Sequence, residues 1–459
     1  MPDGGSIWEP RTTIMTARVL EAQAATICPL LAAIFEAFAR TNIAYCVLRG
    51  YKAIMRGDVD GDVDLLVAPD QFERMRGVLG QFGFVALARW GQAPHHFFIG
   101  YDESREYWIK LDVVTELAYG RPIPALRTAM AAACLDNRRR YGPLFVPRAE
   151  EELLALLLHC LLDKGVVEPA YQARLAELAC AIADDQALGA HVTRCFPPSL
   201  AWPQIKQAIL RGEWDALLKA RRAVMAQLAG RDPVGTRWRR VIRPALRFLD
   251  RRTRALRSRG FSVALLAPDG AGKTTLARAL GQTFYLPTRY IYMGTNLESS
   301  TITLPTTRWL RKLERRRRHP LVRMLGALNT LLEQGVRYRV AAYHRRRGRL
   351  VVFDRYTASA LTTGQRSGAL HKRLQRWVMG KLCPPPDVVI YLDAPAEVLY
   401  ERKQEHSPAV LEQQRQRYLQ LLQDVARKAI VDVRSGPDEV RRQVAGLIWC
   451  RYAADQQGR

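Results

Sequence analysis

Short apolar runs alternate with helix-forming segments in the second half of the chain. Three of these runs are nearly free of polar residues: Ser262–Ala267, Leu350–Phe353 and Val388–Leu392. Such runs are typical of strands that are buried on both faces of a parallel sheet. A helix-forming segment, Leu276–Leu280, follows the first run after a glycine-rich turn. The pattern therefore predicts an α/β domain with a parallel sheet over residues 261–459.

The first 150 residues show a different pattern, in which a helix precedes several short strands. The spacing of apolar residues predicts one helix from about Thr16 to Arg40 and a second over Asp70–Leu79. Strands are predicted at Ala44–Leu48, Val63–Val67, Phe82–Leu87, His96–Gly100 and Tyr107–Val114. We therefore expect a small α+β domain over residues 1–150.

Residues 151–230 are predicted to form a helical region, and no chemical motif stands out in them. They lead into a basic stretch, 231–260, in which arginines are interleaved with apolar side chains such as Trp238, Ile242 and Phe248. We place the main domain boundary in this stretch. The basic linker then joins the α+β domain and its helical extension to the α/β domain.

The charge distribution supports this division. The 459-residue chain has a formal net charge of +26, which divides into −2 for residues 1–152, +10 for 153–260 and +18 for 261–459. No stretch approaches the roughly 18 apolar residues of a membrane-spanning helix, and no secretory signal is visible. The 8 cysteines form no C-x-x-C pair, which disfavours a disulfide framework or a zinc site. We therefore expect a cytoplasmic protein.

The strongest local motif is the glycine-rich turn after the first apolar run. It matches the phosphate-binding pattern G-x-x-x-x-G-K-[ST], except that Ala267 stands at the first glycine. Its glycines allow backbone N–H groups to turn inward around a polyphosphate at a helix N-terminus. The alternative is a β–α turn with an incidental lysine. The residues predicted to bind ATP are Gly270, Ala271, Gly272, Lys273, Thr274 and Thr275.

An acidic residue at the end of a second apolar run supports this prediction. Asp354 directly follows Leu350–Phe353, as expected for a carboxylate that lies beside Mg²⁺ in a nucleotide site. Thr274 is the other predicted Mg²⁺ ligand, through its hydroxyl group. The alternative for Asp354 is a buried strand that ends in a capping aspartate.

These motifs together resemble the thymidylate kinase family of P-loop nucleoside monophosphate kinases. The segments Pro386–Ala394 and Ile430–Asp432, with a helix predicted after each, fit the same family. The resemblance implies a three-layer α/β kinase fold and phosphoryl transfer from ATP with Mg²⁺. It assigns catalytic roles to Lys273, Asp354, Arg355 and Asp269: Asp354 would orient the metal or the acceptor, Arg355 would clamp a phosphate, and Asp269 would face the acceptor.

The family closes a basic lid over the phosphates, and the chain departs from the family around the acceptor. The candidates for the lid are Arg402, Lys403, Arg415 and Arg417, with a solvated helix face as the alternative. Where the family carries a Glu-Pro-Gly stretch that helps to bind thymidylate, this chain has Arg289–Asn296. After Asp354-Arg355-Tyr356, Thr362-Thr363-Gly364 replaces the usual Ala-Tyr-Gln. We therefore expect an acceptor other than thymidylate.

Three carboxylates in the first domain form a second constellation. Asp62 and Asp64 are two residues apart on one predicted strand, and Asp112 lies on another. Carboxylates so placed share one face of a sheet and are predicted metal ligands. With Leu48–Tyr51 before them, they resemble the polymerase-β-like nucleotidyltransferase superfamily, although Tyr51 replaces the small residue expected at the triphosphate. Catalysis and non-catalytic recognition both stay open, and His95 and His96 are interpreted as surface or packing residues.

The basic stretches 237–259 and 306–349 are predicted to contact an anionic membrane surface, because apolar residues interleave their arginines. A solvated helical linker and an insert helix packed on the kinase are the alternatives. No nucleic-acid-reading module accompanies them, which disfavours nucleic acid as a partner. The leading hypothesis is a phosphotransferase acting on a nucleotide, sugar or lipid-linked glycan, a setting that the resemblance associates with surface-polysaccharide synthesis. The alternatives are a metal-dependent nucleotidyltransferase with a regulatory ATP-binding half and a non-catalytic adaptor for anionic surfaces.

Overall fold

The chain divides into two compact units, which are described separately below. Residues 16–102 and 107–252 belong to the N-terminal unit, and residues 253–459 belong to the C-terminal unit. The division falls within the basic stretch 231–260. A computed structural model describes residues 27–458 apart from 59–60, 88–94, 122, 183–184, 258–259, 295, 297–299, 317–318, 357–376, 379 and 405.

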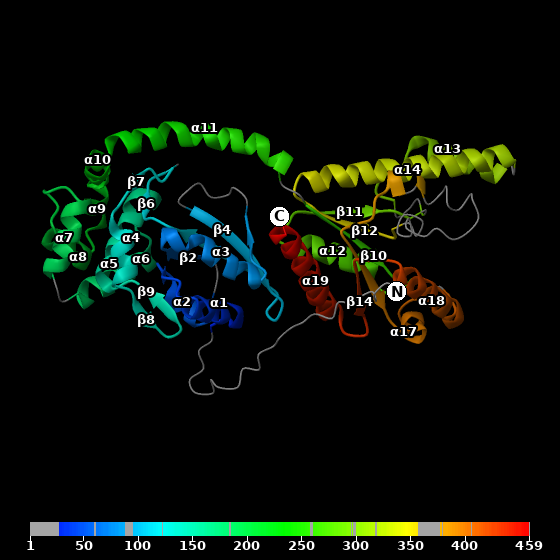
Figure 1. Ribbon diagram of the computed structural model, residues 1–459, viewed down its shortest axis with the longest axis horizontal. Coiled ribbons are helices and arrows are strands. Elements are labelled where there is room, and N and C mark those ends of the chain that lie inside the picture. Colours follow the sequence, from blue (N-terminus) through cyan, green and yellow to red (C-terminus); the bar gives the residue numbers. More distant parts are fainter. Residues whose placement is uncertain are drawn as a thin grey trace, which may run out of the picture. The chain divides into compact units, whose positions relative to one another are not determined.

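The N-terminal unit is built on a mixed five-stranded sheet with the order β1-β2-β5-β4-β3 (Figure 1). Strands β2 and β5 pair in parallel, whereas the other neighbours in this sheet are antiparallel. The strands are β1 (Tyr45–Val47), β2 (Asp62–Val67), β3 (Val85–Ala86), β4 (His95–Asp102) and β5 (Tyr107–Val114). The predicted strands are therefore present, and β5 has the predicted bounds.

Helices cover both faces of this sheet. On one face, side chains such as Leu65 and Leu111 pack with α1 and α3; on the other, Leu66 and Val114 pack with α4 and α5. The helices of this part are α1 (Pro29–Arg40), α2 (Tyr51–Met55), α3 (Phe72–Gln81), which follows the 3-10 turn η1 (Pro69–Gln71), α4 (Met130–Asp136) and α5 (Ala149–Leu158). Two short hairpins are also present: β6 (Ala118–Tyr119) with β7 (Leu126–Arg127), and β8 (Arg139–Tyr141) with β9 (Leu144–Val146).

The helical region continues from α5 as one packed cluster. Helix α5 runs into a π-helical turn, η2 (His159–Lys164), and π-helical turns are frequent at functional sites. The following helices are α6 (Pro169–Ala181), α7 (Asp185–Cys195), α8 (Trp202–Arg211), α9 (Trp214–Lys219), α10 (Arg221–Arg231) and α11 (Pro233–Arg257). Within the described residues, no helix is both long and apolar enough to cross a membrane.

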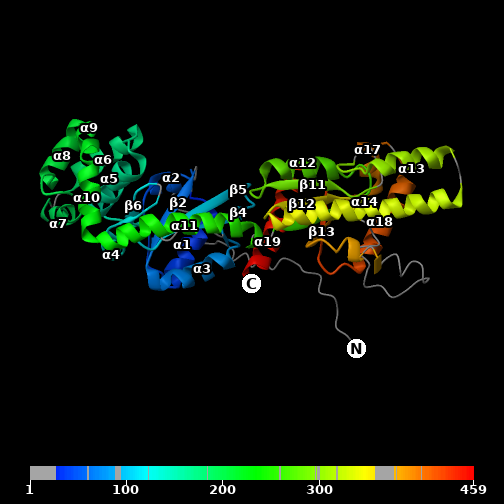
Figure 2. The same ribbon diagram turned by 90° about the horizontal axis from the view of Figure 1, so that it is seen from above.

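The C-terminal unit contains the predicted parallel sheet, with the order β11-β12-β10-β13-β14. Figure 2 labels β11, β12 and β13 of this sheet. Alternate side chains point to opposite faces, so Ala264 and Phe353 pack with α14 and α18. Helices α12 and α19 pack together and contact strands β12 and β13. The strands are β10 (Phe261–Leu266), β11 (Thr288–Tyr292), β12 (Leu350–Asp354), β13 (Val388–Asp393) and β14 (Lys428–Asp432).

Helices lie on both sides of this sheet, which is a three-layer α/β arrangement. They are α12 (Lys273–Thr283), α13 (Pro305–Arg316), α14 (Pro320–Arg346), α17 (Ala396–Arg402), α18 (Pro408–Gln423) and α19 (Pro437–Gln457). Strand β10 pairs with β12 on one side and β13 on the other, and Leu265 is the register partner of Asp354. The sheet therefore brings the glycine-rich loop after β10 next to Asp354 at the end of β12.

Candidate functional site

The glycine-rich loop adopts a conformation that only its glycines allow without strain. Gly270 has φ +91° and Gly272 has φ +81°, both in the left-handed region. A Cβ on Gly270 would also lie 2.8 Å from the carbonyl oxygen of Leu399. Gly272 is the N-cap of α12, so the loop ends at the positive end of a helix dipole. The local sequence thus builds an anion-binding turn at the end of a buried strand.

The ammonium group of Lys273 lies buried beneath this loop. Its Nζ donates hydrogen bonds to the carbonyl oxygens of Ala267 at 3.0 Å and Pro268 at 2.7 Å, and only 7% of the residue is exposed. Burial lowers the pKa of Lys273 to about 8, although the charge of Asp269 works in the opposite direction. The side chain is therefore held at the loop as a desolvated cation that a phosphate oxygen would stabilise.

Thr274 and Asp354 meet at the end of the central strands. The Thr274 hydroxyl donates to Asp354 Oδ2 at 3.1 Å, and the hydroxyl of Tyr290 on β11 donates to the same oxygen at 2.7 Å. Asp354 is buried, and within the described residues its Oδ1 has no hydrogen-bond partner. A buried carboxylate oxygen without a partner, next to a hydroxyl group, fits a hard cation such as Mg²⁺. Tyr290 was missed by the sequence prediction, because a tyrosine on a strand carries no motif.

Arg355 and Asp269 form an ion pair across the loop. Arg355 Nη2 lies 2.5 Å from Asp269 Oδ1, and His406 Nε2 lies 3.7 Å from Asp269 Oδ2. Burial lowers the pKa of the Arg355 guanidinium group. The negative charge of Asp269 raises this pKa, and the net result is a raised pKa. Arg355 also has φ +61°, a strained conformation for a residue with a side chain. Strain of this kind is concentrated at functional sites, where the surrounding structure maintains it.

Two cavities flank the phosphate loop. The first, of about 560 Å³, is lined by Gly270, Ala271, Gly272 and Thr275 of the loop, by Arg402 and by residues 433–438, which lead into α19. The second, of about 360 Å³, is lined by Asp269, Arg355 and three residues of α18 that carry polar groups: Gln414, Arg417 and Tyr418. A cavity on each side of one phosphate loop is the arrangement that two substrates exchanging a phosphoryl group require.

The four predicted lid residues differ in whether they line one of the two cavities. Arg402 Nη2 donates to the carbonyl oxygen of Val433 at 2.8 Å in the first cavity, and Arg417 lines the second. Lys403 lies beside the loop, since its Cβ is 3.5 Å from where a Cβ on Gly270 would lie. Arg415 instead forms a two-pronged ion pair with Asp393, at 2.7 and 2.9 Å, and lines neither cavity. Arg415 therefore has a partner within the protein, and its role in the lid stays a prediction.

Helix α14 anchors the segment in which the chain departs from the thymidylate kinases. Arg337 is 3% exposed and donates to the carbonyl oxygens of Gly294 at 2.7 Å and Ile302 at 2.9 Å. It also pairs with Glu333, one helical turn earlier. The predicted alternative of an insert helix that packs on the kinase therefore describes this part of α14. The i,i+4 spacing of Glu333 and Arg337 was the available sequence signal, but it does not distinguish a buried pair from an exposed one.

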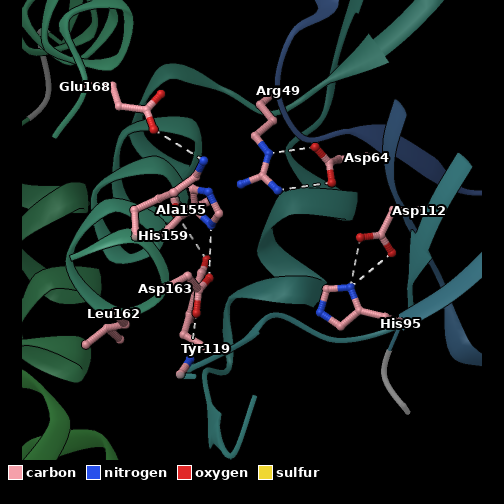
Figure 3. A network of polar contacts seen from close by, with 12 residues as sticks. Arg49, Asp64, His95, Asp112, Tyr119, Ala155, His159, Leu162, Asp163 and Glu168 are labelled. Carbon is pink, nitrogen blue, oxygen red and sulfur yellow. Dashed lines mark hydrogen bonds and ion pairs between the residues drawn. The ribbon is translucent and has the colours of Figure 1, made fainter. Parts of the chain in front are cut away.

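The N-terminal unit contains a second polar site, shown in Figure 3. Asp64 on β2 and Asp112 on β5 are register partners and line a cavity with Arg49, His95 and His159. Each carboxylate pairs with a basic side chain: Arg49 Nε lies 2.6 Å from Asp64, and His95 Nδ1 lies 3.0 Å from Asp112. On η2, His159 Nδ1 lies 2.9 Å from Asp163 Oδ2. His95 therefore has a polar partner in the site, beyond the surface or packing role predicted for it.

Side chains of the same unit pair with the three carboxylates predicted as metal ligands. Asp62, the third predicted ligand, pairs with Lys110 Nζ at 2.8 Å. Tyr51 is buried, and its hydroxyl donates to Glu152 at 2.9 Å. In the part of the chain that the structure describes, no group of three His, Cys, Asp or Glu residues is arranged to hold a metal ion. Arg49, His95 and Lys110 lie beside the three carboxylates, and the assignment of Asp62, Asp64 and Asp112 as metal ligands stays a prediction.

Two comparisons with known proteins bear on the C-terminal unit. Residues 268–444 match the thymidylate kinase family model. A solved structure of thymidylate kinase from Candida albicans is also similar, with 17% sequence identity, a TM-score of 0.30, and coverage of 40% of this chain and 89% of that chain. A search of curated proteins found no match.

The thymidylate-kinase-like segment contains the phosphate loop, Asp354, Arg355 and all four predicted lid residues. The family match covers less than half of the chain and supports the coarser prediction, a thymidylate-kinase-like segment in the C-terminal unit. It does not extend to the N-terminal unit, so the nucleotidyltransferase resemblance stays a prediction.

Proposed function

We propose that the C-terminal unit transfers a phosphoryl group from ATP to an anionic acceptor other than thymidylate. The observation that carries this proposal is the buried Lys273 ammonium under a glycine-rich loop, with one cavity on each side of the loop. Phosphoryl transfer depends chiefly on positioning and charge stabilisation, and these residues supply both. Thr274 and Asp354 would hold Mg²⁺, which would neutralise phosphate charge when bound.

The first cavity fits the donor nucleotide. Loop N–H groups from Gly270 to Thr275 and the N-terminus of α12 face a polyphosphate, and Lys273 would bind its terminal phosphates. The cavity extends from the loop to Arg402 and the segment 433–438, which offers room for the base and ribose. Leu276 and Val440 add apolar side chains to its lining. We therefore assign ATP to this side of the loop.

The second cavity fits the acceptor. Arg355 and Arg417 bring two guanidinium groups to it, and Asp269 faces it from the loop. Guanidinium groups bind phosphates and carboxylates in a forked geometry, so the acceptor would carry such a group. The segment 289–294 departs from the thymidylate-binding pattern and is held by α14. Nucleotides, sugar phosphates and lipid-linked glycan phosphates are the acceptor classes that satisfy this chemistry.

Transfer of label from γ-³²P-ATP to a panel of these acceptors, with thymidylate included, tests the proposal. The wild-type chain should label one anionic acceptor class, whereas Lys273→Ala should lose about 100-fold or more of the transfer. Arg278→Ala is the matched control, since Arg278 is exposed on the same helix. Labelling of thymidylate as the preferred acceptor would contradict the assignment. ATP binding without transfer to any acceptor would favour a regulatory ATP-binding half.

The N-terminal cavity favours a second candidate function, transfer of a nucleotide. Asp64 and Asp112 lie side by side on parallel strands and line a cavity that also contains Arg49. Transfer from an α-³²P-labelled nucleoside triphosphate should be lost in Asp64→Asn and retained in Lys273→Ala if this candidate is right. Loss of γ-phosphoryl transfer in Asp64→Asn alone would instead reverse the assignment of the two units.

A further inference from the structure

Helix α11 is fixed to the N-terminal unit by one of its faces. Arg239 is buried and donates from Nε to the carbonyl oxygen of Ala125 at 2.9 Å, and Arg243 donates from Nη1 to that of Pro124 at 3.0 Å. Asp232 accepts from Arg239 Nη2 at 2.8 Å and from the backbone N–H of Gly235 at 2.9 Å. Because these bonds join α11 to the backbone before β7, they set which face of the helix points outward.

The outward face carries a stripe of large apolar side chains. Val234 is 79% exposed, Trp238 65%, Val241 69% and Phe248 57%. Their spacing of four, three and seven residues places them on one side of an α-helix, opposite Arg239 and Arg243. A contiguous exposed apolar stripe of this kind marks an interaction surface. The docking of the other face means that the helix cannot rotate to bury this stripe in its own unit.

Arginine dominates the charge of the helix. Residues 233–257 contain nine arginines and one aspartate. Arg237 and Arg240 are exposed, and at 100° per residue both lie on the same side of the apolar stripe, with Arg237 next to it. An apolar stripe with arginines along one edge is complementary to a surface that is apolar within and anionic outside.

We propose that the stripe Val234–Trp238–Val241–Phe248 with Arg237 and Arg240 docks on an anionic lipid bilayer. The apolar side chains enter the boundary between headgroups and acyl chains, and the two arginines bind lipid phosphates. A nucleic acid would satisfy the arginines but leave both valines in water. A second copy of the helix would bring like charges together. The proposal is independent of the kinase reaction.

Flotation of the full chain with lipid vesicles tests this proposal. Vesicles of phosphatidylcholine mixed with phosphatidylglycerol should carry the protein at low salt, and vesicles of phosphatidylcholine alone should not. The double variant Arg237→Gln/Arg240→Gln should lose about tenfold or more of the affinity, since each arginine near such a surface contributes a several-fold factor. Trp238→Ser/Phe248→Ser should lose binding by a similar factor, and far-ultraviolet circular dichroism shows whether each variant is folded.

Matched controls separate the surface from overall charge and apolarity. Lys219→Gln/Arg222→Gln removes two exposed charges from α9 and α10, and Leu210→Ser removes an exposed leucine from α8. Both controls should keep wild-type affinity. Equal binding to neutral vesicles, or equal losses in the controls, would overturn the proposal. Tighter binding to duplex DNA that is insensitive to Trp238→Ser/Phe248→Ser would assign the surface to nucleic acid, and dimers lost in that variant, with no vesicle binding, would assign it to a second copy.

Discussion

The hydroxyl of Thr274 lies 3.1 Å from Oδ2 of Asp354, although 80 residues separate them in the chain. Parallel pairing of β10 with β12 creates this contact, and it leaves Asp354 Oδ1 buried without a partner among the described residues. The pair is the part of the proposed kinase site that is suited to a divalent cation.

Asp354→Asn tests this relationship. The amide keeps the shape of the side chain but removes its negative charge, so Mg²⁺-dependent transfer should fall by about 100-fold or more. Binding of ATP in the presence of chelator should change little, since Lys273 and the loop stay intact. Asp387→Asn is a control for a half-buried aspartate directly before β13, because Asp387 bonds to Ser262 and Arg345 instead. Equal transfer by Asp354→Asn and wild type would refute the metal assignment.

The affinity for ATP should depend on pH through Lys273. Burial holds the pKa of this residue at about 8, so the ammonium group is present at pH 7 and is lost as the pH rises above 8. Above this pH, binding of the ATP phosphates requires that Lys273 takes up a proton. The Kd for ATP should therefore rise by up to about tenfold per pH unit. Calorimetry in buffers of different ionisation enthalpy measures this proton uptake. Lys273→Arg, which stays charged, should show no such rise in this range.

The strained backbone at Arg355 predicts that a glycine variant is more stable than an alanine variant, although both variants bind the acceptor less well. Arg355→Gly relieves the positive φ, whereas Arg355→Ala keeps the strain, and both remove the pairing with Asp269. The glycine variant should therefore be more stable than the alanine variant by about 1 kcal/mol. Both should raise KM for the acceptor far more than KM for ATP. Urea unfolding and steady-state kinetics measure these effects, and equal stability of the two variants would show that the backbone is not strained.

The buried pair on α14 should be essential for stability. Arg337→Met leaves the Glu333 carboxylate buried without its cation, which should cost about 3–5 kcal/mol of unfolding free energy. Glu333→Leu/Arg337→Met removes both charges and should recover part of this loss. Arg339→Met on the same helix is the control, because its side chain is exposed. Chemical denaturation measures the unfolding free energy of the three variants. If the pair were at the surface, all three variants would be as stable as wild type.

The His95–Asp112 pair predicts a pH-dependent contribution to stability. Burial opposes protonation of His95, but its hydrogen bond to Asp112 and the charge of that residue outweigh burial and raise the pKa of His95. A raised pKa in the folded state stabilises the fold below the unfolded pKa, and this stabilisation is lost as the pH rises through the folded pKa. His95→Gln should therefore destabilise the N-terminal unit more at pH 5.5 than at pH 8.5. A loss that is independent of pH would show that the histidine is not charged there.

The N-terminal carboxylates show what a local sequence pattern can and cannot predict. Asp62, Asp64 and Asp112 were placed correctly on two strands, and parallel pairing of β2 with β5 does bring Asp64 beside Asp112. Their partners are Arg49 from a loop, His95 from β4 and Lys110 from β5. The sequence pattern does not give the register of these strands. The side-chain pairing around the carboxylates was therefore not predicted, although the strands themselves were.

The sequence alone determined the buried strands, the phosphate loop and its lysine, because these depend on apolar runs and on glycines that act within a few residues. Only the tertiary structure decided that Asp354 meets Thr274 and Tyr290, that Arg415 is taken by Asp393, and that one face of α11 is held against residues 124–125. The physical reason is that these contacts depend on strand order, register and helix orientation. Those are set by packing between segments that are far apart in the chain, so no local pattern encodes them.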